Sequence, residues 1–231
     1  MDSIILEFES KVEEIEEYFS FIRTTTSLER EPDETRTVIV SMTVFNVLKA
    51  NLFLLLYNLI EASFRDSLEN ICINITDNCL KYKNVISEIK KLWITKKYKN
   101  FEQQCSIPRD ISKAEFMMDK IDTIAEDIIS VNYNNQLSGN VTPNVIKESI
   151  DEYGLSINDS DIEKSALFII KNKRNNLAHG NETFSECGSR YTTQRLEDIK
   201  NESIEYMRFI LENIQSFIIN QEYKSGTQND Q

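Results

Sequence analysis

The chain has 231 residues, a length that suits one large domain or one domain with an insertion. Forty per cent of the residues are apolar, and only five glycines and three prolines occur, so the composition predicts long helices and disfavours a many-stranded sandwich. The formal net charge of -12 argues against a general nucleic-acid binder, because a broad phosphate-binding surface needs clustered lysine and arginine. One local cationic site, or a basic partner, is compatible with that charge.

The first part of the chain predicts two long helices. Residues 3–29 place apolar side chains at three- and four-residue steps, and Pro32 cannot continue the helix. Residues 35–76 contain neither glycine nor proline and predict one long helix, or two with a bend. The most apolar stretch, residues 38–60, is interrupted by asparagine and lysine, so we interpret it as a buried core helix and expect no membrane partner.

The middle of the chain predicts one more helix, followed by an insertion. A lysine-rich third helix is predicted over residues 84–100, around Trp93. Residues 101–140 predict an insertion between the two halves of a helical bundle. They contain a helical stretch near residues 113–129 and a polar loop at residues 132–139.

Stronger start and stop signals follow. Thr142 has the character of an N-cap, with Pro143 at the first helical position, and that short helix is expected to end near Gly154. Residues 160–163, Ser-Asp-Ile-Glu, have capping-box spacing and predict the start of a helix that Gly180 ends. The second half of the chain therefore begins with two further helices.

The chain closes with a long amphipathic segment. Residues 181–191 predict a loop, after which Thr192 or Thr193 caps a last helix that runs to about residue 222. The polar residues 224–231 predict a disordered tail. The whole pattern predicts an all-α fold, an up-and-down bundle of long core helices with a central insertion.

Cysteine and histidine usage bears on metal sites and on location. No two of the four cysteines have C-x-x-C spacing, and the chain has one histidine, so we expect no structural zinc and no cofactor. Scattered cysteines in an acidic chain are usually free and buried, although disulfides stay open. The N-terminus alternates acidic and apolar residues without a basic stretch, so we expect no signal peptide and a cytoplasmic location.

The local feature that suggests chemistry is the segment Lys171 to Gly180, with the letters KNKRNNLAHG, at the predicted end of a helix. Asn175 and His179 are four residues apart and share a helix face. Arg174 is five residues from His179, about 140° around an ideal helix, so the two side chains would line different sides of one site.

These three residue types suit phosphoryl transfer within RNA. An imidazole can exchange a proton at cellular pH, a guanidinium can hold a phosphate, and an amide can orient either group. The RNA 2′-hydroxyl is the nucleophile, so no metal is needed. Cleavage runs most easily with both an acid and a base, and a two-fold dimer would bring two copies of His179 to one site. Alternatively, Arg174 and His179 simply complement the helix dipole.

The segment and its surroundings resemble the HEPN superfamily (higher eukaryote and prokaryote nucleotide-binding domains), whose mark is R-x4-6-H with a polar residue after the arginine. More specifically, the chain looks like the MAE-type HEPN branch, found near bacterial defence and toxin genes. The stretches that carry the likeness are Leu56–Arg65, residues 137–140 with 152–154, the RNNLAHG segment, and residues 181–185 through 190–192. The likeness covers roughly residues 40–215 and implies one HEPN-like helical domain over residues 1–223, a homodimer, and metal-independent RNA cleavage.

The resemblance carries Arg174, Asn175 and His179 onto the family's motif positions. Residues that we expect to support the site or to bind RNA are Lys171, Lys173, Glu61, Arg65, Ser185, Arg190 and Tyr191. Read as ordinary helix features, Glu61 and Arg65 would be an i,i+4 pair, and the last three would form the loop before the final helix. One HEPN branch has a tyrosine two residues after the histidine; Asn181 stands there, so transfer of AMP to a tyrosine of this protein is not supported.

Three functions follow as hypotheses. The first is a metal-independent HEPN endoribonuclease, a toxin or phage-defence effector, with RNA as substrate. The second is a catalytically silent HEPN module that binds a nucleotide, RNA or a partner protein, with the acidic run from Glu13 to Glu17 as its working surface. The third is the antitoxin or immunity component of a two-gene system.

Overall fold

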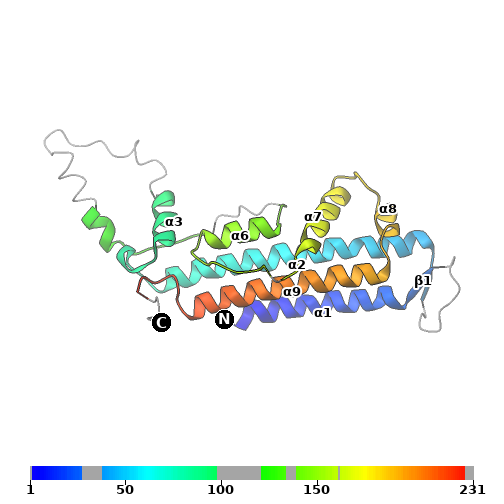
Figure 1. Cartoon of the computed structure of the whole chain (residues 1–231), viewed down its shortest axis with the longest axis horizontal. Coiled ribbons are helices and arrows are strands. Elements are labelled where there is room, and N and C mark those ends of the chain that lie inside the picture. Colours follow the sequence, from blue (N-terminus) through cyan, green and yellow to red (C-terminus); the bar gives the residue numbers. More distant parts are fainter. Residues whose placement is uncertain (1, 28–37, 98–120, 134–138, 161, 227–231) are drawn as a thin grey trace. The chain divides into compact units, whose positions relative to one another are not determined.

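The computed structural model describes residues 2–27, 38–97, 121–133, 139–160 and 162–226. Their elements are predominantly helical, as predicted (Figure 1). The chain divides into two compact units, and each is described by itself. The first comprises Met1–Ser67, Asn135–Ile146 and Ile157–Glu212, and the second comprises Leu68–Asn134, Lys147–Ser156 and Asn213–Gln231.

The first unit is built on three long helices that lie side by side in Figure 1: α1 (Asp2–Thr24), the first part of α2 (Met42–Asp77) and most of α9 (Thr193–Ile219). The predicted inward face of α1 is confirmed, since its apolar residues at three- and four-residue steps are buried: Phe8, Val12, Ile15, Phe19 and Ile22. The hydroxyl of Tyr18 donates a hydrogen bond to the Leu48 carbonyl at 2.7 Å and ties α1 to α2.

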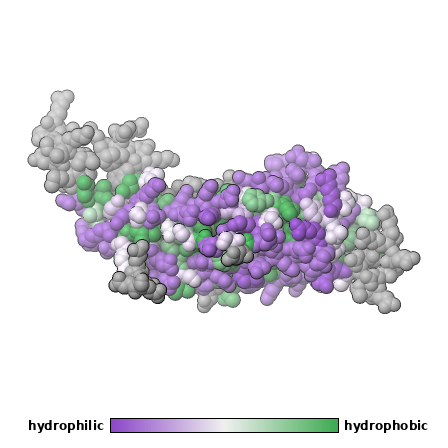
Figure 2. All heavy atoms as spheres, in the orientation of Figure 1, coloured by the Kyte–Doolittle hydropathy of each residue, from purple (hydrophilic) through white to green (hydrophobic). Residues whose placement is uncertain are grey.

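Ion pairs join α1 to α9. The guanidinium of Arg208 donates two hydrogen bonds to Glu9, at 2.7 and 2.9 Å, and the Lys200 side chain, only 3 % exposed, pairs with Glu16. The visible face of the molecule is largely hydrophilic along the long helices, in keeping with the charged outer sides of both helices (Figure 2).

The helix predicted over residues 3–29 was too long at its end, and the one predicted from residue 35 began too early. Between them, β1 (Thr25–Ser27) pairs in parallel with β2 (Val38–Val40). Threonine, valine and isoleucine favour this extended pairing, and helical periodicity alone did not reveal it.

Helix α2 is continuous from Met42 to Asp77, which settles the choice between one helix and two. Within the described part of the chain, it is the helix long and apolar enough to span a membrane. However, 56 % of that apolar window is buried inside the protein, and buried core helices pass the same test.

The second unit contains the end of α2, the helix α3 (Ser87–Lys97) and the end of α9. Helix α3 begins after the predicted residue 84, and residues 98–100 of the predicted helix lie outside the described ranges. The Thr76 hydroxyl accepts a hydrogen bond from the Val131 N–H at 3.1 Å, and Tyr153 contacts the Cys72 sulfur through its hydroxyl at 3.4 Å. Burial raises the pKa of the Tyr153 hydroxyl above its ordinary value. Residues 121–126 are helical, whereas the other residues of the expected insertion lie largely outside the described ranges, as does most of the expected tail.

The structure confirms two of the predicted helix caps, at Thr142 and Thr192. The Thr142 hydroxyl accepts a hydrogen bond from the Val145 N–H at 3.3 Å and caps α6 (Pro143–Asp151), as expected. Thr192 plays the same part for α9 with the Arg195 N–H at 3.1 Å, although α9 ends at Ile219, before the predicted residue 222.

The capping box predicted at residues 160–163 was wrong, because α7 (Ser165–Ala178) begins after it. Its N-cap, Lys164, makes no capping bond through its side chain. A carboxylate from α9 takes that place: Glu202 accepts hydrogen bonds from the Ala166 N–H and, at 3.2 Å, from the Ser165 hydroxyl. The Glu163 carboxylate accepts a hydrogen bond from the Ser165 N–H at 3.0 Å, so a local and a distant carboxylate together cap the start of α7.

Candidate functional site

The candidate motif lies at the C-terminal end of α7, where the helix stops at Ala178 and His179 is the C-cap. The N–H of Asn181 donates to the Asn176 carbonyl at 2.9 Å, and that of Gly180 donates to the Leu177 carbonyl at 3.3 Å. These two bonds are a Schellman motif, and Gly180, at φ +70°, has the left-handed conformation that the motif requires. The predicted stop at Gly180 is confirmed, and the side chain of His179 is exposed there.

Arg174 lies one turn earlier and is partly buried. Its Nη1 donates a hydrogen bond to Oδ1 of Asn175 at 3.0 Å. The guanidinium carbon lies 4.6 Å from the ring centroid of Tyr57 on α2, which is a cation–π contact. The Arg174 and Asn175 side chains are therefore hydrogen-bonded to each other, and the arginine side chain also packs against α2.

A short segment before α6 reaches the same place. The N–H of Gly139 donates to the Glu61 carboxylate at 3.3 Å, and the N–H of Val141 donates to the Tyr57 hydroxyl at 3.2 Å. Burial is the main cause that raises the pKa of Tyr57; the Val141 N–H and Arg174 oppose this rise, and Glu61 adds to it. Glu61 therefore binds the backbone of the glycine that comes close to Arg174, and its expected supporting role stays a prediction.

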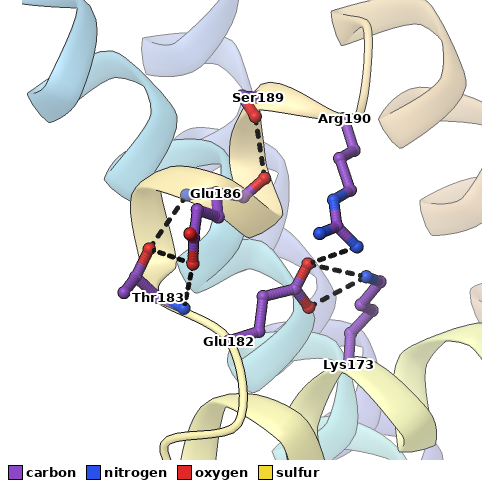
Figure 3. Close-up of polar contacts among 6 residues, drawn as sticks. All are labelled: Lys173, Glu182, Thr183, Glu186, Ser189 and Arg190. Atoms are coloured by element: carbon purple, nitrogen blue, oxygen red, sulfur yellow. Dashed lines mark hydrogen bonds and ion pairs between the residues drawn. The ribbon is translucent and has the colours of Figure 1, made fainter.

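After Gly180 in the chain, Glu182 forms ion pairs with Lys173 and Arg190, two of the cations that were expected to bind RNA (Figure 3). Its side chain is 6 % exposed and accepts hydrogen bonds from Lys173 Nζ at 2.9 and 3.1 Å. Arg190 pairs with the same carboxylate at 3.0 Å, although its own side chain is mostly exposed. Lys173 and Arg190 therefore neutralise a buried acid, so their charges are less available to a phosphate.

The loop predicted over residues 181–191 is instead interrupted by a short helix, α8 (Phe184–Ser189). Its capping box is complete, with the Thr183 hydroxyl accepting from the Glu186 N–H and the Glu186 carboxylate accepting from the Thr183 N–H, as Figure 3 shows. Gly188 lies against α2, where an added Cβ would stand 1.9 Å from the Asn46 carbonyl oxygen. The Thr-x-x-Glu spacing was a sequence signal that could have predicted this helix.

The other expected site residues are scattered around this centre. Arg65 pairs with Asp66 at 3.4 Å, and so does not form the i,i+4 pair with Glu61 that one interpretation suggested. The ring of Tyr191 packs edge-on against Phe53, with centroids 4.9 Å apart. Lys171 and Ser185 are both partly buried, on α7 and α8.

Sequence reasoning did not single out Tyr57, Gly139 or Glu182 as parts of the site. Tyr57 falls inside the Leu56–Arg65 stretch quoted for the resemblance, one turn before Glu61, so its helix face was a usable signal. Gly139 and Glu182 likewise fall inside the quoted stretches 137–140 and 181–185, but an acidic residue in an expected loop is ordinary. The role of Glu182 depends on burial, which the sequence does not display.

The arrangement offers a fixed guanidinium, an amide bonded to it and an exposed imidazole on one helix end. Among the described residues, no group of three or more His, Cys, Asp or Glu side chains comes together as a metal site would require. The thiol of Cys187 is buried in α8, which raises its pKa to about 11 and makes it a poor nucleophile.

Comparison with known proteins identifies the family. Residues 1–223 match the family model of the HEPN_MAE_28990-like HEPN domains. No curated protein and no solved structure matches the chain. Because the match covers nearly the whole chain and the helical fold agrees with it, the protein belongs to the HEPN_MAE_28990-like HEPN family.

Proposed function

We propose that this HEPN protein is a metal-independent endoribonuclease whose catalytic residues are Arg174, Asn175 and His179. The observation that carries the proposal is the form of the end of α7. It joins a guanidinium held by Asn175 and Tyr57 to an exposed imidazole at the C-cap. A held cation and an accessible acid–base group are the two requirements for cleavage by the RNA's own hydroxyl.

In the proposed reaction, the RNA 2′-oxygen forms a bond to the adjacent phosphorus while the bond to the 5′-oxygen breaks. The 2′-hydroxyl proton goes to a base, and the 5′-oxygen takes a proton from an acid. The products are a 2′,3′-cyclic phosphate and a 5′-hydroxyl. Arg174 stabilises the charge that develops on the phosphate oxygens, and Asn175 orients the guanidinium.

His179 is the single histidine of the chain, so one protomer supplies one imidazole. A two-fold homodimer would bring a second His179 to the same RNA and provide both the acid and the base. We place this activity in the cytoplasm, in a toxin or phage-defence effector that a partner protein neutralises or activates.

The first experiment incubates purified protein with total RNA in EDTA, beside His179→Ala and Arg195→Ala. Arg195 is an exposed residue at the start of α9 and serves as the matched control. We expect wild type and Arg195→Ala to yield fragments with 2′,3′-cyclic phosphate ends. General acid–base catalysis contributes about 10²- to 10⁴-fold, so His179→Ala should be slower by that factor. Undiminished cleavage by folded His179→Ala would overturn the assignment.

A silent binding module is the second candidate, and Glu182 is the observation that favours it. This buried carboxylate pairs with Lys173 and Arg190, so these two cations are less available to RNA, and the net charge of -12 disfavours binding of a long RNA. Binding of RNA, a nucleotide or a partner protein that persists in an Arg174→Ala/His179→Ala double variant, without cleavage by wild type, would support this candidate.

A further inference from the structure

We infer that Tyr57 is a positioning residue that holds the Arg174 guanidinium in its working orientation, an inference that rests on the proposed function. Tyr57 lies on α2 and Arg174 on α7, within the same compact unit. The tyrosine side chain touches no substrate in this proposal. It acts through the arginine.

Arg174 and Tyr57 are in direct contact. The guanidinium carbon lies 4.6 Å from the Tyr57 ring centroid, and Tyr57 is only 1 % exposed. A cation over a desolvated aromatic face is held by the ring quadrupole more strongly than at an exposed site. The planar guanidinium also stacks on such a ring in a way that a lysine ammonium cannot.

Tyr57 is itself held in place by a hydrogen bond. Its hydroxyl accepts a hydrogen bond from the Val141 N–H at 3.2 Å, and neighbouring Glu61 accepts one from the Gly139 N–H at 3.3 Å. The segment from Gly139 to Val141 is thereby tied to α2 at two points one helical turn apart. A ring fixed at its hydroxyl end presents a fixed face to Arg174.

The Arg174 guanidinium has little free space beside Gly139. A Cβ added to Gly139 would stand 3.3 Å from Arg174 Nη1, so the glycine backbone comes close to the arginine. The same Nη1 donates to Asn175 Oδ1 at 3.0 Å. Three parts of the chain, namely α2, the Gly139 segment and α7, therefore confine one side chain.

This confinement has a predicted kinetic effect. A free arginine side chain samples many rotamers, and part of that freedom is already lost before RNA binds when the guanidinium is oriented in advance. A misplacement of about 1 Å at a reacting group costs up to about 10²-fold in rate. Loss of the Tyr57 ring should therefore lower kcat more than it changes KM.

The kinetic test compares Tyr57→Leu, Tyr57→Phe and the control Phe64→Leu, a fully buried ring two turns further along α2. We expect Tyr57→Leu to lower kcat by about tenfold or more, with KM changed less than about twofold. Tyr57→Phe keeps the ring and should restore kcat to within about threefold, and Phe64→Leu should match wild type at a similar loss of stability. Equal losses of kcat in Tyr57→Leu and Phe64→Leu would reduce Tyr57 to a core residue and overturn the inference.

A second measurement works whether or not the protein cuts RNA. In the arginine Nε–Hε NMR spectrum, the Arg174 resonance is assigned by its disappearance in Arg174→Lys, and the Tyr57 ring current should displace it. Tyr57→Leu should return it to the position of a free arginine, whereas Tyr57→Phe and Phe64→Leu should leave it in place. Should Tyr57→Leu fail to fold, Tyr57→Met, whose unbranched side chain adapts to irregular core space, takes its place. An unmoved resonance in the folded variant would overturn the inference, while absence of RNA cleavage by wild type would overturn only the proposed function.

Discussion

The two ends of the RNNLAHG segment differ in how firmly the protein holds them. At one end, Arg174 contacts an aromatic ring of α2 and an amide of its own helix, and a Cβ added to Gly139 would stand 3.3 Å from its Nη1. At the other, His179 is an exposed C-cap whose backbone closes the helix while its side chain faces outward. One motif therefore combines a prearranged cation with an accessible imidazole.

The difference follows from the chemistry that each residue would perform. Charge stabilisation benefits from a rigid donor, because no energy is then spent on reorienting it during the reaction. Proton transfer needs contact with the substrate and with a second acid–base group, so an exposed imidazole is suitable. The chain that follows His179 is anchored by Glu182, which pairs with both Lys173 and Arg190.

The largest expected effect separates the two ends directly. Arg174→Ala should slow RNA cleavage by about 10²- to 10³-fold. It should also lower the free energy of unfolding by about 1 kcal/mol through the lost ring contact and hydrogen bond. His179→Ala should slow cleavage by about 10²- to 10⁴-fold but keep its stability within about 0.5 kcal/mol, because the side chain is exposed. Chemical denaturation and cleavage rates measure both, and equal stability losses would contradict the comparison.

The next effect concerns the anchor beyond His179. Glu182→Ala leaves Lys173 with its partner removed in a largely buried position, so unfolding should become easier by about 3 kcal/mol. Glu13→Ala, at an exposed site on α1, is the matched control and should stay near wild type. Urea denaturation of the three proteins is the measurement. A loss no larger than that of the control would mean that Glu182 is not an anchor.

A pair of glycines gives a smaller and more selective test. Gly139 and Gly180 have φ values of +74° and +70°, so alanine at either position should cost about 1–2 kcal/mol of backbone strain. An added Cβ meets Arg174 at Gly139 and nothing within 4 Å at Gly180. Gly139→Ala should therefore move the Arg174 Nε–Hε resonance, and Gly180→Ala should leave it unchanged. The reverse pattern would show that Arg174 is not confined by the Gly139 segment.

The smallest effect lies away from both ends, at the pair between α1 and α9. Hydrogen bonds from Arg208 lower the pKa of Glu9 below 4.5 in the folded protein, so the pair stabilises the fold above pH 4.5. That contribution is lost as the pH falls from 4.5 through the folded pKa, and solvent screening keeps it below about 1 kcal/mol. The Tm difference between wild type and Arg208→Met should shrink from pH 7 to pH 3; a difference that grows on acidification would refute the pair's role.

Local patterns in the sequence correctly predicted several features. The apolar steps of α1, the Thr142 cap of α6 and the stop at Gly180 were all readable, because each depends on residues within one or two turns. The short helix α8 was also readable from Thr183 and Glu186, and was missed only because the segment was interpreted as a loop.

By itself, the sequence determined the helical class, the inward faces of the long helices, the family and the position of the motif at a helix end. Only the tertiary structure decided the parallel pairing of β1 with β2, the capping of α7 by Glu202, and the meeting of Arg174 with Tyr57. The physical reason is the range of the interactions. Helix periodicity and caps are local, whereas a buried ion pair or a ring beneath a guanidinium depends on which distant segments pack together.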